Sequence, residues 1–330
     1  MTPGAADAAS PTDGRPTTTD LLAARAFMAR HYPPTPLEHN WALSRDHGLD
    51  VHVKLENLGP IRSFKARGAL YRLSRLEGDE RARGVVTAST GNHGQGVALA
   101  GRRLAIPAVV VVPEGTPRLK SDNIARLGAE LRVAGRDLAE AEAEAKALAA
   151  ATGRVFVEDG DDAGLMAGAG TIAWEILEKL PGADALVVPV GGGNLIAGMG
   201  LVARLLSPGI RIIGVQSEAA PAVFESWRRG RAVEGPCATF AGGLATARPG
   251  RLAFQVLAGL VDDMVLVTEA ELRRAMLATL EATGQLAEGA GAAAFAALPA
   301  LAPGLAGRKA VLLLSGGNVP VAELKPLFAA

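Results

Sequence analysis

The chain contains a single cysteine, Cys237, so it cannot form an internal disulfide bond, and we expect a reducing, cytoplasmic compartment. It lacks long hydrophobic runs, since the apolar segment 108–112 is far shorter than the roughly 20 residues that a membrane-spanning helix needs. No basic-then-apolar secretion signal stands at the N-terminus. With 34 basic and 34 acidic residues the formal net charge is +0, so no excess of one sign indicates nucleic acid or an anionic membrane as a partner.

The sequence is rich in short apolar segments that alternate with longer amphipathic ones. Its 330 residues, 49% of them hydrophobic, suffice for a large core and two lobes. Strands are predicted at 51–55, 85–88, 108–112, 131–133, 155–157, 185–189, 212–215, 264–267 and 310–314. Helices are predicted from about 21, and at 65–76, 92–104, 120–127, 138–150, 171–180, 195–206, 221–229, 251–260, 269–281 and 290–298. This alternation predicts an α/β fold with parallel sheets, in which ligands bind where loops leave the carboxyl ends of strands.

One lysine stands at the predicted start of a helix. Ser63 is suited to capping that helix, which places Lys65 in the first turn, at the positive end of the helix dipole. Partial burial beside Phe64 disfavours a charged amine, and a neutral amine is what Schiff-base chemistry needs. The alternative is a solvated lysine on a helix surface, as most lysines are.

Two glycine-rich loops follow predicted strands. In the first, residues 89–96, backbone N–H groups and hydroxyls suit a carboxylate or phosphate, and Asn92 could donate to an anionic oxygen. An ordinary strand-to-helix turn is the alternative for this loop. In the second, Gly191–Gly193 leave backbone amides bare, which suits a single phosphate. No Lys-Ser/Thr pair follows these glycines, and the dinucleotide pattern finds only a loose match ending at Gly198, so a nicotinamide dehydrogenase is a remote alternative.

A third loop, residues 315–318, follows the last predicted strand, where Ser315 could hydrogen-bond a neutral ring nitrogen or simply start a helix. Taken in order, residues 63–69, 89–95, 191–193 and 315–318 resemble the pyridoxal-phosphate enzymes of fold type II, most closely the threonine/serine dehydratase and serine racemase group. The resemblance runs from about residue 34 to residue 319. It also includes 35–37, 54–57, 168–171 and 288–291.

The resemblance implies roles for particular residues. Lys65 would hold pyridoxal 5'-phosphate and become the catalytic base once substrate displaces it. The implied cofactor-binding residues are Lys65, Phe64, Asn92, Gly191, Gly192, Gly193, Asn194, Leu195, Gly243, Glu288 and Ser315. Ser89, Thr90, Gly91 and His93 would line the pocket for the substrate carboxylate. Thr90 keeps the hydroxyl that racemases use as a second acid or base, so it is a further catalytic candidate.

The resemblance also implies an architecture and an activity. We expect two open, mostly parallel sheets flanked by helices, with a disordered tail at 1–20, a large cofactor-binding domain at 21–83 and 159–330, and a small substrate-carboxylate domain at 84–158. The implied reaction is β-elimination of threonine, serine or a bulkier 3-hydroxy amino acid to a 2-oxo acid and ammonia, catalysed by a homodimer. The alternatives are an amino acid racemase or a β-replacing synthase on the same scaffold, and a non-enzymatic amino acid-binding module.

The chain departs from the family pattern at three places. Asn194 stands where the phosphate loop usually has a fourth glycine, so binding requires that Asn194 is not forced into a glycine-only conformation. Gln216 and Ala222 occupy positions where racemase-like members carry metal-binding acids, so no metal site is predicted with Glu218 alone. Gly242 replaces an acidic residue, which predicts a pocket wide enough for a β-hydroxy amino acid bulkier than threonine.

Overall fold

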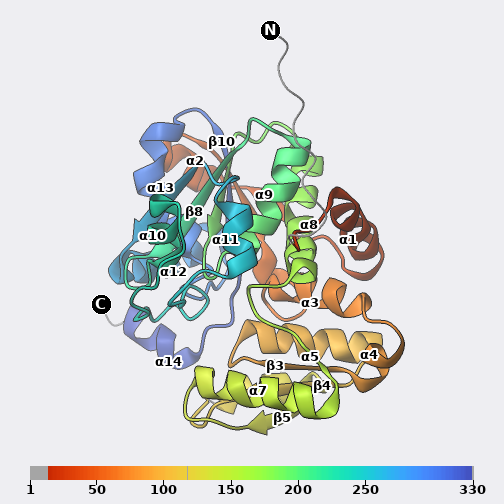
Figure 1. The fold of residues 1–330 in the computed structure, drawn as a ribbon. Helices are drawn as coiled ribbons and strands as arrows, with labels where there is room; N and C mark the ends of the chain where they lie inside the picture. The colour runs from red at the N-terminus through yellow and green to blue at the C-terminus, as the bar shows by residue number, and fades with distance from the viewer. Residues whose placement is uncertain (1–13, 117, 329–330) are drawn as a thin grey trace.

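A computed structural model describes residues 14–116 and 118–328, arranged as two lobes (Figure 1). The large lobe contains a six-stranded sheet. Its order is β1 (Leu37–His39), β2 (Asp50–Leu55), β10 (Lys309–Leu314), β7 (Ala185–Pro189), β8 (Arg211–Ser217) and β9 (Asp263–Val267). All neighbouring strands of this sheet pair in parallel, except that β1 runs antiparallel to β2 at the edge.

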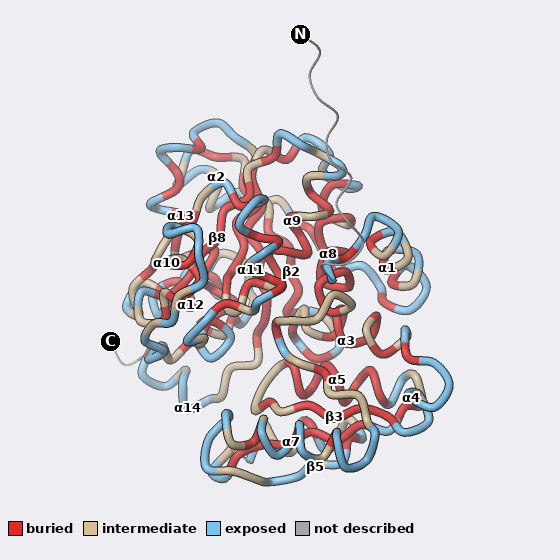
Figure 2. Tube along the Cα trace, viewed as in Figure 1, coloured by how far each residue is buried: buried red, intermediate tan, exposed pale blue. Residues whose placement is uncertain are grey.

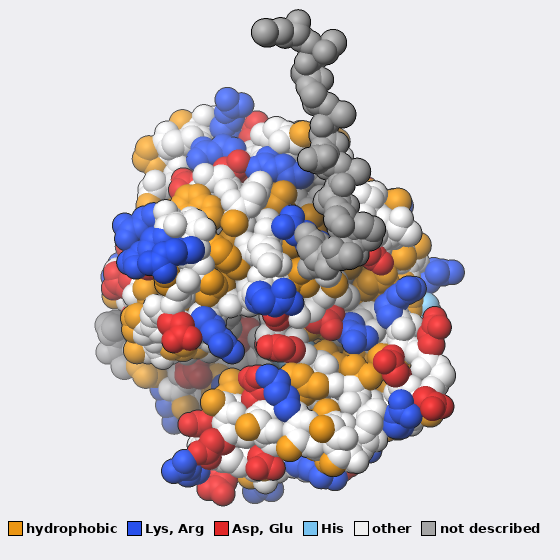
Figure 3. Space-filling view, viewed as in Figure 1, with side chains coloured by type: hydrophobic (Ala, Val, Ile, Leu, Met, Phe, Trp, Pro, Cys, Tyr) orange, Lys and Arg blue, Asp and Glu red, His pale blue; other side chains and the backbone are white. Residues whose placement is uncertain are grey.

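The small lobe contains a four-stranded sheet in which every pair is parallel. Its order is β5 (Glu130–Val133), β4 (Ala108–Val112), β3 (Val85–Ala88) and β6 (Val155–Phe156). The two mainly parallel sheets confirm the predicted fold class. Figure 3 shows acidic and basic side chains interspersed over one face of the molecule, in keeping with the balanced charge of the sequence.

Helices cover both faces of each sheet, and most strand residues are buried (Figure 2). The large-lobe helices are α1 (Thr18–His31), α2 (Trp41–His47), α8 (Ala163–Lys179), α9 (Asn194–Leu206), α10 (Ala222–Arg229), α11 (Arg251–Leu257), α12 (Glu269–Thr283), α13 (Ala293–Leu301) and α14 (Val321–Leu324). The small-lobe helices are α4 (Gly78–Arg83), α5 (Asn92–Leu104), α6 (Arg118–Arg126) and α7 (Leu138–Thr152). Successive residues of one strand face different cores: Leu186 packs with α8 and α9, whereas Val187 packs with α12 and α13.

Helix α3 (Lys65–Ser74) lies between the lobes, packed against α5 on one side and α8 on the other. Glycines make these approaches close. A Cβ on Gly68 would lie 2.8 Å from Leu165 O, and a Cβ on Gly96 would lie 2.9 Å from Lys65 O. The first turn of α3 is therefore fixed at the junction of the two lobes.

Several element boundaries differ from the sequence-based expectation. β1, α2, α4 and α14 were not predicted, because three to seven residues carry too little periodicity. α1 begins at Thr18, where Thr17 and Asp20 form a capping box, so residues 18–20 belong to a helix and not to the expected tail. Residues 1–13, on which that expectation otherwise rests, lie outside the described part of the chain. Within the described residues, no helix combines the length and the apolarity needed to cross a membrane.

Candidate active site

A cavity of about 860 Å³ lies between the lobes and receives loops from both sheets. It is lined by the start of α3 and by the loops that follow β3, β6, β7 and β10, which meet at the carboxyl ends of their strands. Every residue to which the sequence assigns a cofactor, substrate or catalytic role lines this cavity. The site therefore assembles groups from segments more than two hundred residues apart.

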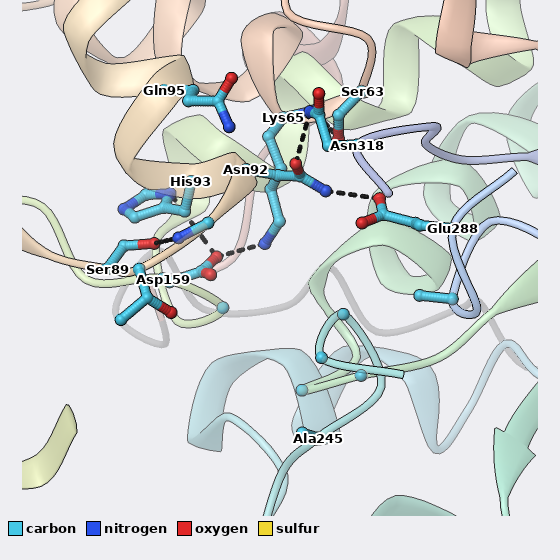
Figure 4. Close-up of a pocket in the computed structure, with 18 of the residues that line it drawn as sticks. Ser63, Lys65, Ser89, Asn92, His93, Gln95, Asp159, Ala245, Glu288 and Asn318 are labelled. Atoms are coloured by element: carbon cyan, nitrogen blue, oxygen red, sulfur yellow. Dashed lines mark hydrogen bonds and ion pairs between the residues drawn. The ribbon is translucent and has the colours of Figure 1, made fainter. Parts of the chain in front are cut away.

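Lys65 is the first residue of α3, and its Nζ points into the cavity (Figure 4). The Nζ atom lies 5.3 Å from the centre of the Phe64 ring and forms an ion pair with Asp159 Oδ1. The predicted cap is wrong in detail: Phe64 is the N-cap and makes no side-chain cap bond, while Ser63 Oγ lies 3.4 Å from Lys65 N. The sequence did not predict the carboxylate partner of this amine.

Asp159 and His93 form the wall next to Lys65. His93 is buried, its Nε2 lies 3.3 Å from Val157 O, and its Nδ1 lies 3.6 Å from Asp159 Oδ1. Since a carbonyl oxygen only accepts, Nε2 carries the ring hydrogen. Burial lowers the pKa of His93, more than Asp159 raises it. Burial alone would raise the pKa of Asp159, but Lys65 outweighs it, together with His93 while that ring is protonated, and the pKa is lowered to about 2.

A chain of amides and a carboxyl crosses the cavity opposite Asp159. Asn92, at the start of α5, donates from Nδ2 to Glu288 Oε1 at 2.6 Å and accepts from Asn318 Nδ2 at 2.7 Å (Figure 4). Burial raises the pKa of Glu288 to about 7, although the Asn92 hydrogen bond acts to lower it. These contacts fix the orientation of the Asn92 amide.

The first glycine loop places further polar groups beside Lys65. Ser89, Thr90 and Gly91 line the cavity between β3 and α5, and Ser89 Oγ accepts from Gly91 N at 3.2 Å. The His93 ring is already engaged by Val157 and Asp159, so the backbone of this loop, more than the imidazole, is available to an anion.

The loop of three glycines forms a backbone cradle at the start of α9. Gly193 has a φ of +102°, and a Cβ there would lie 2.5 Å from Leu257 Cδ2. A Cβ on Gly191 would collide with the carbonyl oxygen of Gly243. The first backbone bond of α9 runs from Ala197 N to Gly193 O, so the amides of Asn194 and Leu195 have no partner within the helix.

Asn194 itself has an ordinary helical backbone, because Arg62 and Ala105 are the non-glycine residues with positive φ among those described. The glycine-only conformation falls on Gly193 instead. Asn194 Oδ1 is buried without a hydrogen-bond partner among the described residues. With its amide turned, the side-chain NH₂ would occupy that place as an unused donor.

The wall of the cavity that carries Gly243 and Ser315 is formed by small residues and one hydroxyl. A Cβ on Gly243 would lie 2.7 Å from Ala290 Cβ, so this wall admits no larger residue there. Ser315 follows β10, is 5% exposed, and its carbonyl accepts from Phe64 N at 3.1 Å, which ties the last strand to the start of α3.

Behind Lys65, α3 is anchored by a buried charge cluster of Lys54, Glu56, Arg67 and Glu175. Arg67 is fully buried, donates to Glu56 at 2.8 and 2.9 Å, and also binds Glu175 on α8. Lys54 on β2 donates to Glu175 as well. Burial alone would raise the pKa of Glu56, but Arg67 and Lys54 hold it below its usual value. Two positive and two negative side chains thus fix the first turn of α3 to β2 and α8.

Comparison with known proteins decides the family. The model of the pyridoxal-phosphate dependent enzyme family matches residues 28–316. The chain belongs to this family. It is 41% identical over 307 residues to an L-threonine ammonia-lyase of Thermotoga maritima, covering 92% of this chain and 76% of that protein. These findings confirm the predicted family and its cofactor.

Solved structures of this family have the same fold. The processed form of threonine deaminase isoform 2 from Solanum lycopersicum superimposes with a TM-score of 0.89 at 33% identity, covering 96% of this chain and 94% of that one. Maize serine racemase superimposes with a TM-score of 0.88 at 29% identity, covering 94% and 96% of the two chains. Both principal alternatives from the sequence, dehydratase and racemase, are therefore represented among similar structures.

The residues present fit pyridoxal phosphate. The group needs an amine for its aldehyde, donors for its phosphate and a partner for its ring nitrogen. Lys65 Nζ, the unpartnered amides at the start of α9 and the Ser315 hydroxyl offer these in one cavity. Beside the glycine cradle, turning the Asn194 amide would place its NH₂ group where the buried, unpartnered Oδ1 now lies and so add a further donor.

Two site residues were missed from the sequence. Asp159 lies in an acidic run, residues 158–162, that directly follows β6, and its position after a strand was the available signal. Its ion-pair partner stands 94 residues earlier, which no local pattern reveals. Asn318 lies within the motif after β10, but its bonds to Asn92 Oδ1 and Ile61 O could not be foreseen.

Proposed function

We propose that the chain is a pyridoxal-phosphate dependent ammonia-lyase that eliminates the β-hydroxyl of threonine, serine or a bulkier β-hydroxy amino acid. What supports this activity is the convergence of the Lys65 amine, the Gly191–Gly193 cradle and Ser315 on one cavity. The relative from Thermotoga maritima is an L-threonine ammonia-lyase. The overall reaction converts the amino acid to a 2-oxo acid and ammonia, since the water lost on elimination is regained on hydrolysis.

Pyridoxal phosphate, when bound, draws electrons from the amino acid attached to it and so acidifies the neighbouring C–H group. Lys65 would hold the cofactor through Nζ and, when its amine is free, would take the α proton at that atom. Gly191, Gly192, Gly193, Asn194 and Leu195 bind the phosphate through backbone amides at the positive end of α9.

The remaining site residues orient the reacting groups. Phe64 and Gly243 would pack beside the cofactor ring, and Asn92, itself held by Glu288, would donate to the ring 3-oxygen. Ser315 would offer its neutral hydroxyl to the ring nitrogen of the cofactor, a partner that favours loss of the β-hydroxyl. The start of α5 receives the substrate carboxylate, through Ser89, Thr90, Gly91 and His93.

The cavity leaves room beyond threonine. A Cβ on Gly242 would meet no atom within 4 Å, so the wall that carries this residue is open. The volume of about 860 Å³ is at the upper end of the range for small-molecule sites. We therefore expect β-hydroxy amino acids with larger side chains to be turned over at least as well as threonine.

The experiment combines labelling with a substrate panel. Borohydride treatment of the holoenzyme followed by peptide mapping is expected to place the reduced cofactor on Lys65. Lys65→Ala should lose more than 10³-fold in 2-oxo acid formation over the panel, because the same amine binds cofactor and takes the α proton. Lys120→Ala, which removes another lysine from the same cavity, is the matched control and should keep the label. Label at any other site, or none, contradicts the proposal.

A racemase is the second candidate, favoured by the cavity-lining Thr90 hydroxyl and by the likeness to maize serine racemase. Chirality and 2-oxo acid assays on the same samples separate the two activities. Inversion of serine that outpaces 2-oxo acid formation would establish the racemase.

The proposed domain boundaries, compartment and oligomeric state are taken from the resemblance to the family. We place the domain boundaries at 83/84 and 158/159, and we propose a cytoplasmic homodimer without a metal at Gln216 and Glu218. Gln216 Oε1 already accepts from Phe224 N at 2.9 Å, which supports the absence of metal at that residue.

A further inference from the structure

We propose that Asp159 is a positioning residue for Lys65, one that holds the amine whenever it is free and stabilises the ammonium that forms when it takes the α proton. This inference rests on the proposed function. Asp159 lies in the loop between β6 and α8, and its Oδ1 pairs with Lys65 Nζ across the junction of the lobes (Figure 4). The Asp159 side chain is 40% exposed, so its carboxylate is accessible from the cavity.

The surroundings leave Lys65 as the cation that holds Asp159. Because His93 Nε2 carries the ring hydrogen, a neutral His93 ring turns an unprotonated Nδ1 toward Asp159 and supplies no charge. The buried ring therefore acts as a fixed wall that limits where the carboxylate can turn. The other charged residues that line the cavity are Arg62, Lys120, Arg126, Glu142, Glu158, Asp161, Arg248, Glu288 and Glu323.

Asp161 is occupied elsewhere, since its Oδ1 accepts from Leu252 N. The neighbouring Asp162 is occupied as well, because it caps α8 and pairs with Arg72. Of the three aspartates in this loop, only Asp159 pairs with the Lys65 amine in the cavity.

A carboxylate at this place affects both tasks of Lys65. The amine sits on a flexible four-carbon stem, so a fixed ionic partner restricts Nζ to one part of the cavity each time it is released. In the proton transfer, the substrate C–H bond breaks and an N–H bond forms at Nζ, while the C–H electron pair stays with the substrate and expels the β-hydroxyl. The positive charge that appears on Nζ then lies in contact with Asp159, which lowers the energy of that step.

The test compares holoenzymes that differ by one charge. Asp159→Asn keeps the shape and removes the negative charge, and Glu158→Gln removes a charge from the same wall without touching Lys65. We expect Asp159→Asn to lower by about 1–2 pH units the midpoint at which the cofactor's visible absorption titrates, because an adjacent anion favours the protonated form. Glu158→Gln should leave the midpoint within about 0.3 units of wild type.

Kinetics supply a second readout. Asp159→Asn should reduce kcat by about 10- to 100-fold with less than a threefold change in KM, since the loss falls on the proton transfer and not on substrate binding. Asp159→Glu, which keeps the charge, should recover part of both effects. If the Asn variant does not fold, Asp159→Ser decides by the same midpoint.

An unchanged absorption midpoint in the Asn or Ser variant, or an equal shift in Glu158→Gln, overturns the role of Asp159. Such a result would leave the proposed function standing, provided that wild type still carries the reduced cofactor on Lys65. Absence of that label in wild type instead removes the proposed function itself.

Discussion

At the scale of single residues, Glu288 shows how burial sets the chemistry of the site. It is half-buried beside Asn92, and its pKa is raised from an ordinary value of 4.5 to about 7. A carboxyl with a raised pKa favours the folded state while it is protonated. Its contribution to stability is therefore complete below about pH 4.5 and is lost as the pH rises to about 7.

Glu288→Gln removes this titration while keeping an oxygen that can accept from Asn92. With cofactor stripped from both proteins, we expect the variant to exceed wild type in free energy of unfolding at pH 8 by up to about 3 kcal/mol. Well below pH 4.5 the two proteins should be equally stable, because Glu288 is then neutral in both states. Urea unfolding at the two pH values measures the difference, and a gap that is the same at both would contradict the raised pKa.

Gly193 carries the only backbone strain that the phosphate cradle requires. Gly193→Ala forces a Cβ into a φ of +102° and against Leu257, so the free energy of unfolding should fall by about 1–3 kcal/mol and cofactor binding should weaken. Gly192→Ala is the matched control for stability, since its nearest neighbour would be 3.9 Å away. Denaturant unfolding of the two variants checks this, and an equal loss in both would disprove the assignment of strain to Gly193.

At the scale of elements, the buried charge cluster joins β2, α3 and α8 behind the catalytic lysine. Its members are exposed by at most 16% of their side-chain surface. Because the pKa of Glu56 is held below its usual value of 4.5, the cluster stabilises the fold above that pH and loses its contribution as the pH falls. The same contacts fix the direction in which α3 begins.

Glu56→Gln leaves the buried Arg67 guanidinium short of a carboxylate, and the free energy of unfolding should drop by about 3–5 kcal/mol at pH 7. Glu140→Gln breaks an exposed pair between α7 and Arg136, which precedes that helix, and serves as the control, with no measurable change expected. Thermal or urea unfolding compares the two variants. Equal stabilities would show that the cluster contributes no more than a surface pair.

The elements themselves were largely predictable, and the reasons for the exceptions are physical. Apolar strands such as β4 and β7 are buried on both faces, so unbroken runs of apolar residues reveal them. Boundaries depended on capping residues: α8 starts at Ala163 and not near 171, because Asp162 caps it, and three glycines among its first eight residues obscure the helical pattern. β1 pairs at an edge over only three residues, too few for a period.

At the scale of the whole molecule, the sequence could place the glycine loops and Lys65 in one cavity because parallel strands align their carboxyl ends. It could not predict which acid meets Lys65, since that choice depends on how the two lobes are set against each other. Asp159 reaches the amine from a loop at the rim of the small sheet, while α3 is fixed to the large lobe through Arg67. Spacing within one segment carries no information on such a contact.

The empty space in front of Gly242 has a practical consequence for protein engineering. Because a Cβ added there would meet no atom of the protein within 4 Å, a side chain can start from this position without displacing its immediate neighbours. Alanine, valine and phenylalanine substitutions at this position are expected to narrow the range of accepted amino acids stepwise as the side chain grows.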